Sequence, residues 1–198
     1  MKEKNPHRKG RIRPVLKEWA ESLLIAFILA MIIRTFFIQA FKIPTGSMRP
    51  TLLEGDVILV SKFLYGPKIP FTDIRLPGLR QPKRGDVIVF IYPKNTKKDF
   101  IKRLVAVGGE TVEIKNGTVY VNDKPLTESV FSQRYYYNRG SWGEGGVKIK
   151  VPDESFFVLG DNSASSEDSR YWGFVPRKNI LGKAILIYWP FPRVRIIR

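Results

Sequence analysis

The feature that most constrains the fold is an apolar run behind a basic leader. Residues 22–33 carry no charge, and residues 22–41 form a stretch of 20 residues whose one charge is Arg34. About 20 apolar residues are enough to cross a bilayer as a helix. The apolar residues lie on all sides of a helical wheel, unlike the single stripe of an amphipathic surface helix. The run therefore predicts a transmembrane helix over residues 19–40.

The flanking residues predict the orientation of this helix. Residues 1–18 hold seven Lys or Arg and two acidic residues, and such an excess of positive charge marks the cytoplasmic side of a span. Arg34 can extend its long side chain to the opposite interface, where charged groups are solvated. We therefore expect a cytoplasmic leader over 1–18, a single pass through the cytoplasmic membrane, and an extracytoplasmic domain over 41–198.

Two alternatives stay open for the apolar run, a cleaved secretory signal and a buried helix of a soluble protein. A cleaved signal ends in small residues at an A-x-A spacing, whereas residues 38–40 begin with a large Ile. The stretch without any charge, residues 22–33, has only 12 residues, a length that also fits a buried core helix. Release from membranes by alkaline carbonate would contradict the anchor.

The composition limits the chemistry that the chain can perform. Hydrophobic residues make up 43% of the chain, which supports a folded core and excludes a disordered protein. The chain has no cysteine, and its one histidine, His7, lies in the leader. Disulfides, thiolate metal sites and a cysteine nucleophile are excluded, and a Ser-His-Asp triad is not expected. Hydrolysis would need another base, and we expect no metal or other cofactor.

The residues after the apolar run alternate short apolar segments with turns. The segments are rich in Val, Ile, Phe and Tyr and predict strands at residues 56–60, 86–91, 101–107, 111–114, 118–121, 155–159 and 182–188. Asn116 and Gly117 predict a two-residue hairpin turn. We therefore predict a mostly β, barrel-like or sandwich-like domain behind one N-terminal transmembrane helix.

Three segments could carry chemistry. Ser47 follows Gly46, which lets a substrate backbone approach the hydroxyl. On the strand predicted at 101–107, Lys102 and Arg103 point to opposite faces, so one of the two cations must lie on the apolar side or at its edge. The polar residues 160–173 form either a solvated loop or a support for such a group.

A buried lysine can replace histidine as a base. A lysine with a pKa of about 10.4 is neutral in about one molecule in 2,500 at pH 7. Burial that lowers this pKa to about 8 makes the lysine neutral in about one molecule in ten. A Ser–Lys pair is a known variant of the triad. The alternative is a lysine that reaches solvent from an exposed edge strand.

The motifs, taken in order, resemble those of bacterial type I signal peptidases, membrane-bound serine proteases that remove signal peptides. The resemblance covers residues 20–190, with PTGSMRPTL, RGDVIVF, IKRLVAVGGE and GDN followed by DSRYWG behind the leader and span. It implies a β-rich catalytic core with Ser47 as nucleophile and Lys102 as general base. The Ser47 N–H and the Thr45 hydroxyl match the oxyanion-hole donors, and Ser166 matches a hydroxyl that hydrogen-bonds the lysine.

The resemblance also implies structural ion pairs, substrate pockets and partners. The expected ion pairs join Arg103 to Asp161 and Arg170 to Asp168. The positions that line shallow pockets for small side chains are Phe41, Ile43, Met48, Leu52, Val89 and Ile101. The implied substrates are secretory preproteins with small residues at positions −1 and −3, cleaved at the outer face of the membrane, with membrane lipid but no nucleic acid or metal as partner. The family usually has Arg after Gly-Asp-Asn, where this chain has Ser163, followed by Ala164 and Ser165.

Two other functions remain possible from the sequence alone. Residues 42–198 hold 26 basic and 15 acidic residues, a net charge of +11, which suits a tethered module that binds anionic lipid or polymer without catalysis. A self-cleaving Ser–Lys repressor relative would need a DNA-binding domain, for which the leader is too short. Phe71, Trp189 and Phe191 are candidates for lipid contact, with core packing as the alternative.

Overall fold

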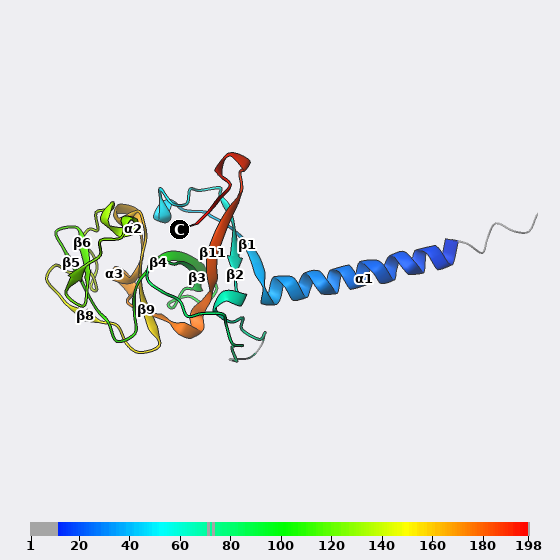
Figure 1. The fold of residues 1–198 in the computed structure, drawn as a ribbon, viewed down its shortest axis with the longest axis horizontal. Helices are drawn as coiled ribbons and strands as arrows, with labels where there is room; N and C mark the ends of the chain where they lie inside the picture. Colours follow the sequence, from blue (N-terminus) through cyan, green and yellow to red (C-terminus); the bar gives the residue numbers. More distant parts are fainter. Residues whose placement is uncertain (1–11, 71, 73, 198) are drawn as a thin grey trace, which may run out of the picture.

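The structure is a computed structural model that describes residues 12–70, 72 and 74–197. One long helix, α1 (Ile12–Phe36), projects from a β-rich body (Figure 1). Within it, Lys17–Phe36 is long and apolar enough to cross a membrane, and no part of that window is buried in the protein. The leader expected over 1–18 and the candidate Phe71 lie largely or wholly outside the described residues.

The helix ends earlier than the apolar run predicts. It stops at Phe36, and Ile38–Lys42 forms strand β1 instead of the end of a span. All five residues of β1 pair antiparallel with β2 (Val57–Ser61), so their backbone groups are satisfied by a sheet partner rather than by helical hydrogen bonds. The predicted boundary at residue 40 is therefore wrong, because a short apolar segment has no periodicity that separates strand from helix.

The body consists of two antiparallel sheets. The larger sheet has the strand order β1, β2, β11 (Ile180–Trp189), β3 (Val87–Ile91), β4 (Asp99–Val107), β9 (Ser155–Leu159) and β10 (Val175–Pro176), and β12 (Arg195–Ile196) pairs with β11. The smaller sheet has the order β7 (Lys124–Pro125), β6 (Thr118–Val121), β5 (Thr111–Lys115) and β8 (Ile149–Lys150). Two four-residue helices, α2 (Ser129–Ser132) and α3 (Ser169–Trp172), complete the body. The prediction of a mostly β protein behind an apolar helix is confirmed.

All seven predicted strands are present, and the predicted hairpin joins β5 to β6. Asn116 and Gly117 have φ angles of +49° and +79°, the left-handed conformation that a tight two-residue hairpin needs and that glycine adopts without strain. The strands missed by sequence, β1 apart, are two residues long and carry too little pattern to be recognised.

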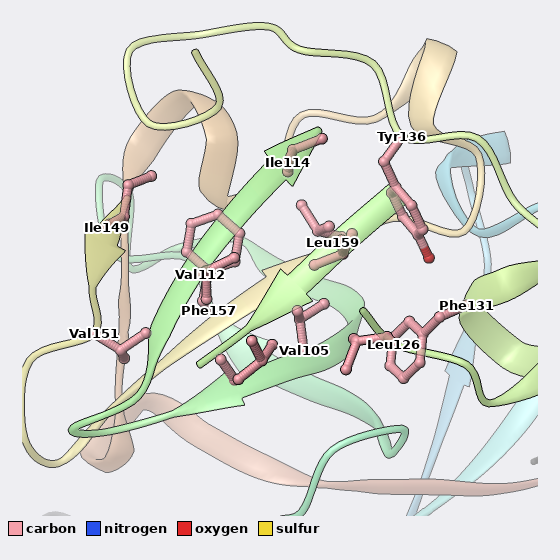
Figure 2. Packing of buried hydrophobic residues seen from close by; sticks show 13 residues of the cluster. Val105, Val112, Ile114, Leu126, Phe131, Tyr136, Ile149, Val151, Phe157 and Leu159 are labelled. Carbon is pink, nitrogen blue, oxygen red and sulfur yellow. The ribbon is translucent and has the colours of Figure 1, made fainter. Parts of the chain in front are cut away.

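Strand β4 lies between hydrophobic clusters on both of its faces. One cluster joins Val105 of β4 and Phe157 of β9 to Val112 and Ile114 of the smaller sheet (Figure 2). A second cluster contains Leu104, together with residues of β3 and β9. The register between β4 and β9 shifts between Leu104 and Ala106, which places Val105 and Ala106 in the same cluster and breaks the simple alternation expected from the sequence.

Candidate active site

The structure brings together Ser47 and Lys102, which are 55 residues apart in the sequence. Lys102 Nζ lies 2.8 Å from Ser47 Oγ and also donates a hydrogen bond of 3.0 Å to the Ile101 carbonyl. Lys102 is 4% exposed and Ser47 is 7% exposed. The ring of Phe100 lies 5.3 Å from Nζ and covers it from one side. The amine and the hydroxyl therefore meet within hydrogen-bond distance in a site from which most water is excluded.

Burial changes the acid–base chemistry of this lysine. It lowers the pKa of Lys102 from its usual 10.5 to about 8, although the carboxylates of Asp168, Glu167 and Asp161 act in the opposite direction. Desolvation disfavours a charged ammonium, which explains the direction. Near neutral pH a useful fraction of Lys102 is an uncharged amine that can accept a proton.

Gly160 and Asn162, in the loop after β9, position the turn that carries Ser47. Ser47 lies in a one-turn helix over Gly46–Met48. The Asn162 backbone N–H donates to the Ser47 carbonyl at 3.0 Å, and its side-chain amide donates to the Gly46 carbonyl at 3.1 Å. A Cβ at Gly160 would overlap the Ser166 side chain and lie 2.6 Å from Ser47 O. Only glycine allows the loop after β9 to approach Ser47 this closely.

A buried ion network anchors the same loop to β4. Arg103 donates to both carboxylate oxygens of Asp161, at 2.7 and 2.6 Å, with both side chains 1% exposed. The Thr51 hydroxyl donates to Asp161 as well, and Arg134 adds a second cation at 3.2 Å. Because Asp161 pairs with both Arg103 and Arg134, these charges can be buried, and Arg134 Nε is the atom of the network that has no hydrogen-bond partner among the described residues. The network ties Asp161, next to Asn162, to the strand that carries Lys102.

The second expected ion pair is also present. Arg170 donates from Nε to Asp168 at 2.8 Å and from Nη2 to its other oxygen at 2.9 Å, and both side chains are fully buried. Asp168 accepts the Gly160 N–H at 3.0 Å. Ser163 has a defined place here, because its hydroxyl accepts hydrogen bonds of 2.8 Å from Arg170 and 2.9 Å from the Tyr137 N–H. Arg170 and Ser163 thus connect the loop after β9 to the segment that follows α2.

A cavity of about 240 Å³ opens onto the pair. Its walls include Ser47, Lys102, Thr45 and the carboxylates Asp99 and Glu167. The Tyr92 hydroxyl donates to Glu167 at 3.0 Å and holds this carboxylate in place. No group of three or more His, Cys, Asp or Glu suited to a metal occurs in the part of the chain that the structure describes.

Of two residues with expected roles, Thr45 is exposed at the cavity and Ser166 is buried. Thr45 is exposed on the cavity wall and makes no side-chain cap to the following turn, so its hydroxyl is available to a ligand. Ser166 is buried, but its hydroxyl has no hydrogen-bond partner among the described residues. The expected bond between Ser166 and Lys102 is therefore absent, since the described hydrogen bonds of Nζ go to Ser47 and to Ile101 O.

The six expected pocket residues gather in one apolar cluster. Ile43, Met48, Leu52 and Val89 are buried in it, and Phe41 and Ile101 pack against it half-buried. Of these six, Ile101 also lines the cavity beside Ser47. The four buried members have almost no surface that a ligand could contact, whereas Phe41 and Ile101 keep part of theirs.

Sequence reasoning missed several groups around the pair. Thr51 and Asn162 lie inside recognised motifs but were assigned no role. Glu167 and Asp99 were not distinguished from other surface acids, and Arg134 lies in a segment without a motif. The signal that could have found Arg134 is weak, because its contact with Asp161 spans 27 residues and depends on how α2 packs.

Comparisons with known proteins agree on one family. The family model described as signal peptidase, peptidase S26, matches residues 16–189. A probable signal peptidase I-2 of Synechocystis sp. is 39% identical over 197 residues, covering 96% of this chain and 82% of the relative. The signal peptidase I of Pseudomonas aeruginosa is 33% identical over 215 residues, covering 91% of this chain and 76% of the relative.

A solved structure belongs to the same group. The crystal structure of a signal peptidase I from Enterococcus faecalis V583 is 32% identical and covers 52% of this chain and 97% of that chain, with a TM-score of 0.45. The family match confirms the resemblance seen in the motifs and removes the alternatives of a non-catalytic tethered module and a repressor relative. The chain belongs to the signal peptidase family, peptidase S26, and is a peptide-bond hydrolase of that family.

Proposed function

We propose that the protein removes signal peptides from secretory preproteins by a Ser–Lys mechanism. The observation that carries this proposal is the 2.8 Å contact between Lys102 Nζ and Ser47 Oγ in a buried site. Neutral Lys102 accepts the Ser47 proton as Oγ attacks the scissile carbonyl. Lys102 then donates that proton to the leaving amine, which leaves an acyl-enzyme. In the second half of the reaction, Lys102 accepts a proton from water as the water attacks the ester carbonyl, and it returns this proton to Ser47 Oγ.

The neighbours of the pair support the charges that form during the reaction. The Ser47 N–H and the exposed Thr45 hydroxyl stabilise the oxyanion, and the loss of one such donor typically costs about 2.7–4 kcal/mol. Protonated Lys102 has three N–H donors where the neutral amine has two. The unpartnered hydroxyl of Ser166 then serves as the additional acceptor, which is how Ser166 orients the lysine in this proposal.

The apolar cluster supports a preference for small residues at positions −1 and −3. Phe41 and Ile101 contact the substrate, and the buried members Ile43, Met48, Leu52 and Val89 leave little depth beneath them. The substrate lies extended beside the site, so that its backbone is recognised as an added strand. The reaction uses no cofactor.

The exposed apolar helix supports a membrane anchor. In this proposal residues 1–18 are cytoplasmic, α1 spans the cytoplasmic membrane once, and the β-rich body acts at its outer face. Anchoring raises the effective concentration of a substrate held in the same bilayer. Retention of the full chain in the membrane pellet after alkaline carbonate extraction is the expected result, and release would contradict the anchor.

Replacement of either member of the pair tests the mechanism. Ser47→Ala and Lys102→Ala should each lower kcat/KM on a preprotein with Ala at −1 and −3 by about 10⁴-fold or more. Ser165→Ala is the matched control, because Ser165 lines the same cavity but has no part in the proposed proton transfers. Cleavage at the normal rate by either Ser47→Ala or Lys102→Ala would refute the Ser–Lys mechanism.

A further inference from the structure

A large cavity lies away from the Ser–Lys pair, where α1 meets the body. Its volume is about 780 Å³, and its walls come from the end of α1, from β1 and from the segment after β2. The lining includes the cations Arg34, Lys62 and Lys68, the polar Gln39 and the apolar Met31. This is the level of the molecule at which an apolar span gives way to the polar body.

Two cations of this cavity, Arg34 and Lys62, lie close to each other. Lys62 Nζ donates a hydrogen bond of 3.2 Å to the Arg34 carbonyl at the end of α1. Burial lowers the pKa of Lys62, and the charge of Arg34 lowers it further, while Asp99 acts in the opposite direction. Within residues 12–70, 72 and 74–197, neither Arg34 nor Lys62 forms an ion pair with a carboxylate. An anion placed between them would relieve this repulsion.

The surface around these cations is apolar. Phe37 and Phe63 stack with their ring centroids 5.4 Å apart and are 43% and 40% exposed. The Lys62 N–H donates to the Phe37 carbonyl at 2.9 Å, so the aromatic pair and the cations belong to one small region. Two exposed phenylalanine rings beside an apolar span form an apolar surface of the kind that marks a site of membrane contact. A free inorganic anion would use the cations alone, whereas a lipid would use both.

We propose that this cavity binds the headgroup of an anionic phospholipid. The phosphate lies between Arg34 and Lys62, and the acyl chains run along the apolar surface of α1 beside Met31. Lys68 also lies on the cavity wall. The bound lipid fixes α1 against β1 and the body. The inference rests on the membrane anchor of the proposed function but not on the Ser–Lys mechanism.

Lipid titration of the detergent-solubilised full chain tests the site. Short-chain phosphatidylglycerol should raise the thermal unfolding midpoint in a saturable way, because a ligand that binds the native state stabilises it. Short-chain phosphatidylcholine should have little effect. Glycerol phosphate, which has the anion without acyl chains, should bind more weakly. An equal effect of phosphatidylcholine, or equally tight binding of glycerol phosphate, would overturn the proposal.

Charge-removing variants locate the site on the molecule. Arg34→Gln combined with Lys62→Gln should weaken phosphatidylglycerol binding about thirtyfold, since each cation near a lipid surface contributes about 1 kcal/mol. The matched control is Lys124→Gln with Lys150→Gln, which removes the same charge from β7 and β8 in the smaller sheet. Lys62→Arg keeps the charge and should retain binding.

Three results would overturn the proposal: unchanged affinity in the Arg34 and Lys62 double variant, equal loss in the control, or loss in Lys62→Arg. Cleavage of a detergent-soluble peptide by each variant shows that its body is folded. Because binding is measured without substrate, failure of the lipid site and failure of the peptidase mechanism give different results.

Discussion

Helix α1 exposes apolar side chains, whereas strand β4 buries charged ones. Along α1, large apolar side chains such as Trp19, Leu23 and Ile25 are 66–68% exposed. In β4, the cations Lys102 and Arg103 are only 4% and 1% exposed. Either arrangement would be unfavourable for an ordinary soluble protein. The polar network around β4 explains the buried cations, and the proposed bilayer around α1 would explain the exposed apolar side chains.

The two cations of β4 also differ from each other in how burial is tolerated. An arginine keeps its charge in proteins, and Arg103 is accordingly paired with Asp161 and surrounded by hydrogen-bond acceptors. Lysine can release its proton, and burial lowers the pKa of Lys102 to about 8. Adjacent residues thus show the structural and the chemical use of a buried cation.

Charges introduced into α1 give the largest expected effect. Leu24→Asp with Ile28→Asp should raise the free energy of membrane insertion by about 5–7 kcal/mol, because each acid near the centre of a span costs about 2.5–3.5 kcal/mol. The variant should appear in the supernatant after carbonate extraction, while Leu24→Val with Ile28→Val stays in the pellet. Retention of the charged variant would mean that α1 does not lie across the bilayer.

The second largest effect is expected from the loss of Asp161, the carboxylate that pairs with Arg103. Asp161→Asn should lower the free energy of unfolding by about 3–5 kcal/mol, because it leaves Arg103 and Arg134 without their carboxylate in a buried site. Urea unfolding at pH 7 measures the change. Asp153→Asn removes an exposed carboxylate and should leave the midpoint within error. Equal stability of the two variants would show that the buried network contributes little.

Replacement of the buried Lys102 should raise the free energy of unfolding, whereas replacement of Asp161 should lower it. Lys102→Met should abolish cleavage yet raise the free energy of unfolding at pH 7 by up to about 3 kcal/mol. The folded-state pKa of about 8 lies below the usual 10.5, so the unfolded chain binds more protons between these values and the wild type gains stability as pH rises through this range. The advantage of the variant should therefore be full below pH 8 and fade by about pH 10.5.

The control for this stability measurement is Lys98→Met, which replaces an exposed lysine and should not alter the pH dependence. If Lys102→Met is less stable than the wild type at every pH, packing and hydrogen bonding of the lysine outweigh its desolvation.

The smallest expected effect concerns the carboxylate on the cavity wall. Glu167 raises the pKa of Lys102, so Glu167→Gln should move the acidic limb of the kcat/KM profile to lower pH. The shift should be small because Glu167 is exposed and solvent screens its charge. Measurements from pH 6 to 10 with Glu144→Gln as an exposed control would resolve it. A shift to higher pH would contradict the assigned direction.

The strengths and failures of sequence reasoning follow the range of the interactions involved. The Asn116-Gly117 turn and seven of the strands are local patterns, and they were predicted correctly. The predicted helix wrongly included residues 38–40 of strand β1, because the partner of this strand, β2, lies about 20 residues away. Arg134 was missed for the same reason, since nothing near it in the chain marks its contact with Asp161.

The order of residues along the chain determined an apolar helix, a β-rich body and the motifs of the family, because periodicity, turn chemistry and motif spacing are local properties. Only the tertiary structure decided that Lys102 is buried within 2.8 Å of Ser47, that Ser166 lacks its expected partner, and that α1 ends at Phe36. Proton affinity and strand pairing depend on which distant segments surround a group and exclude water from it, and that environment exists only once the chain has folded.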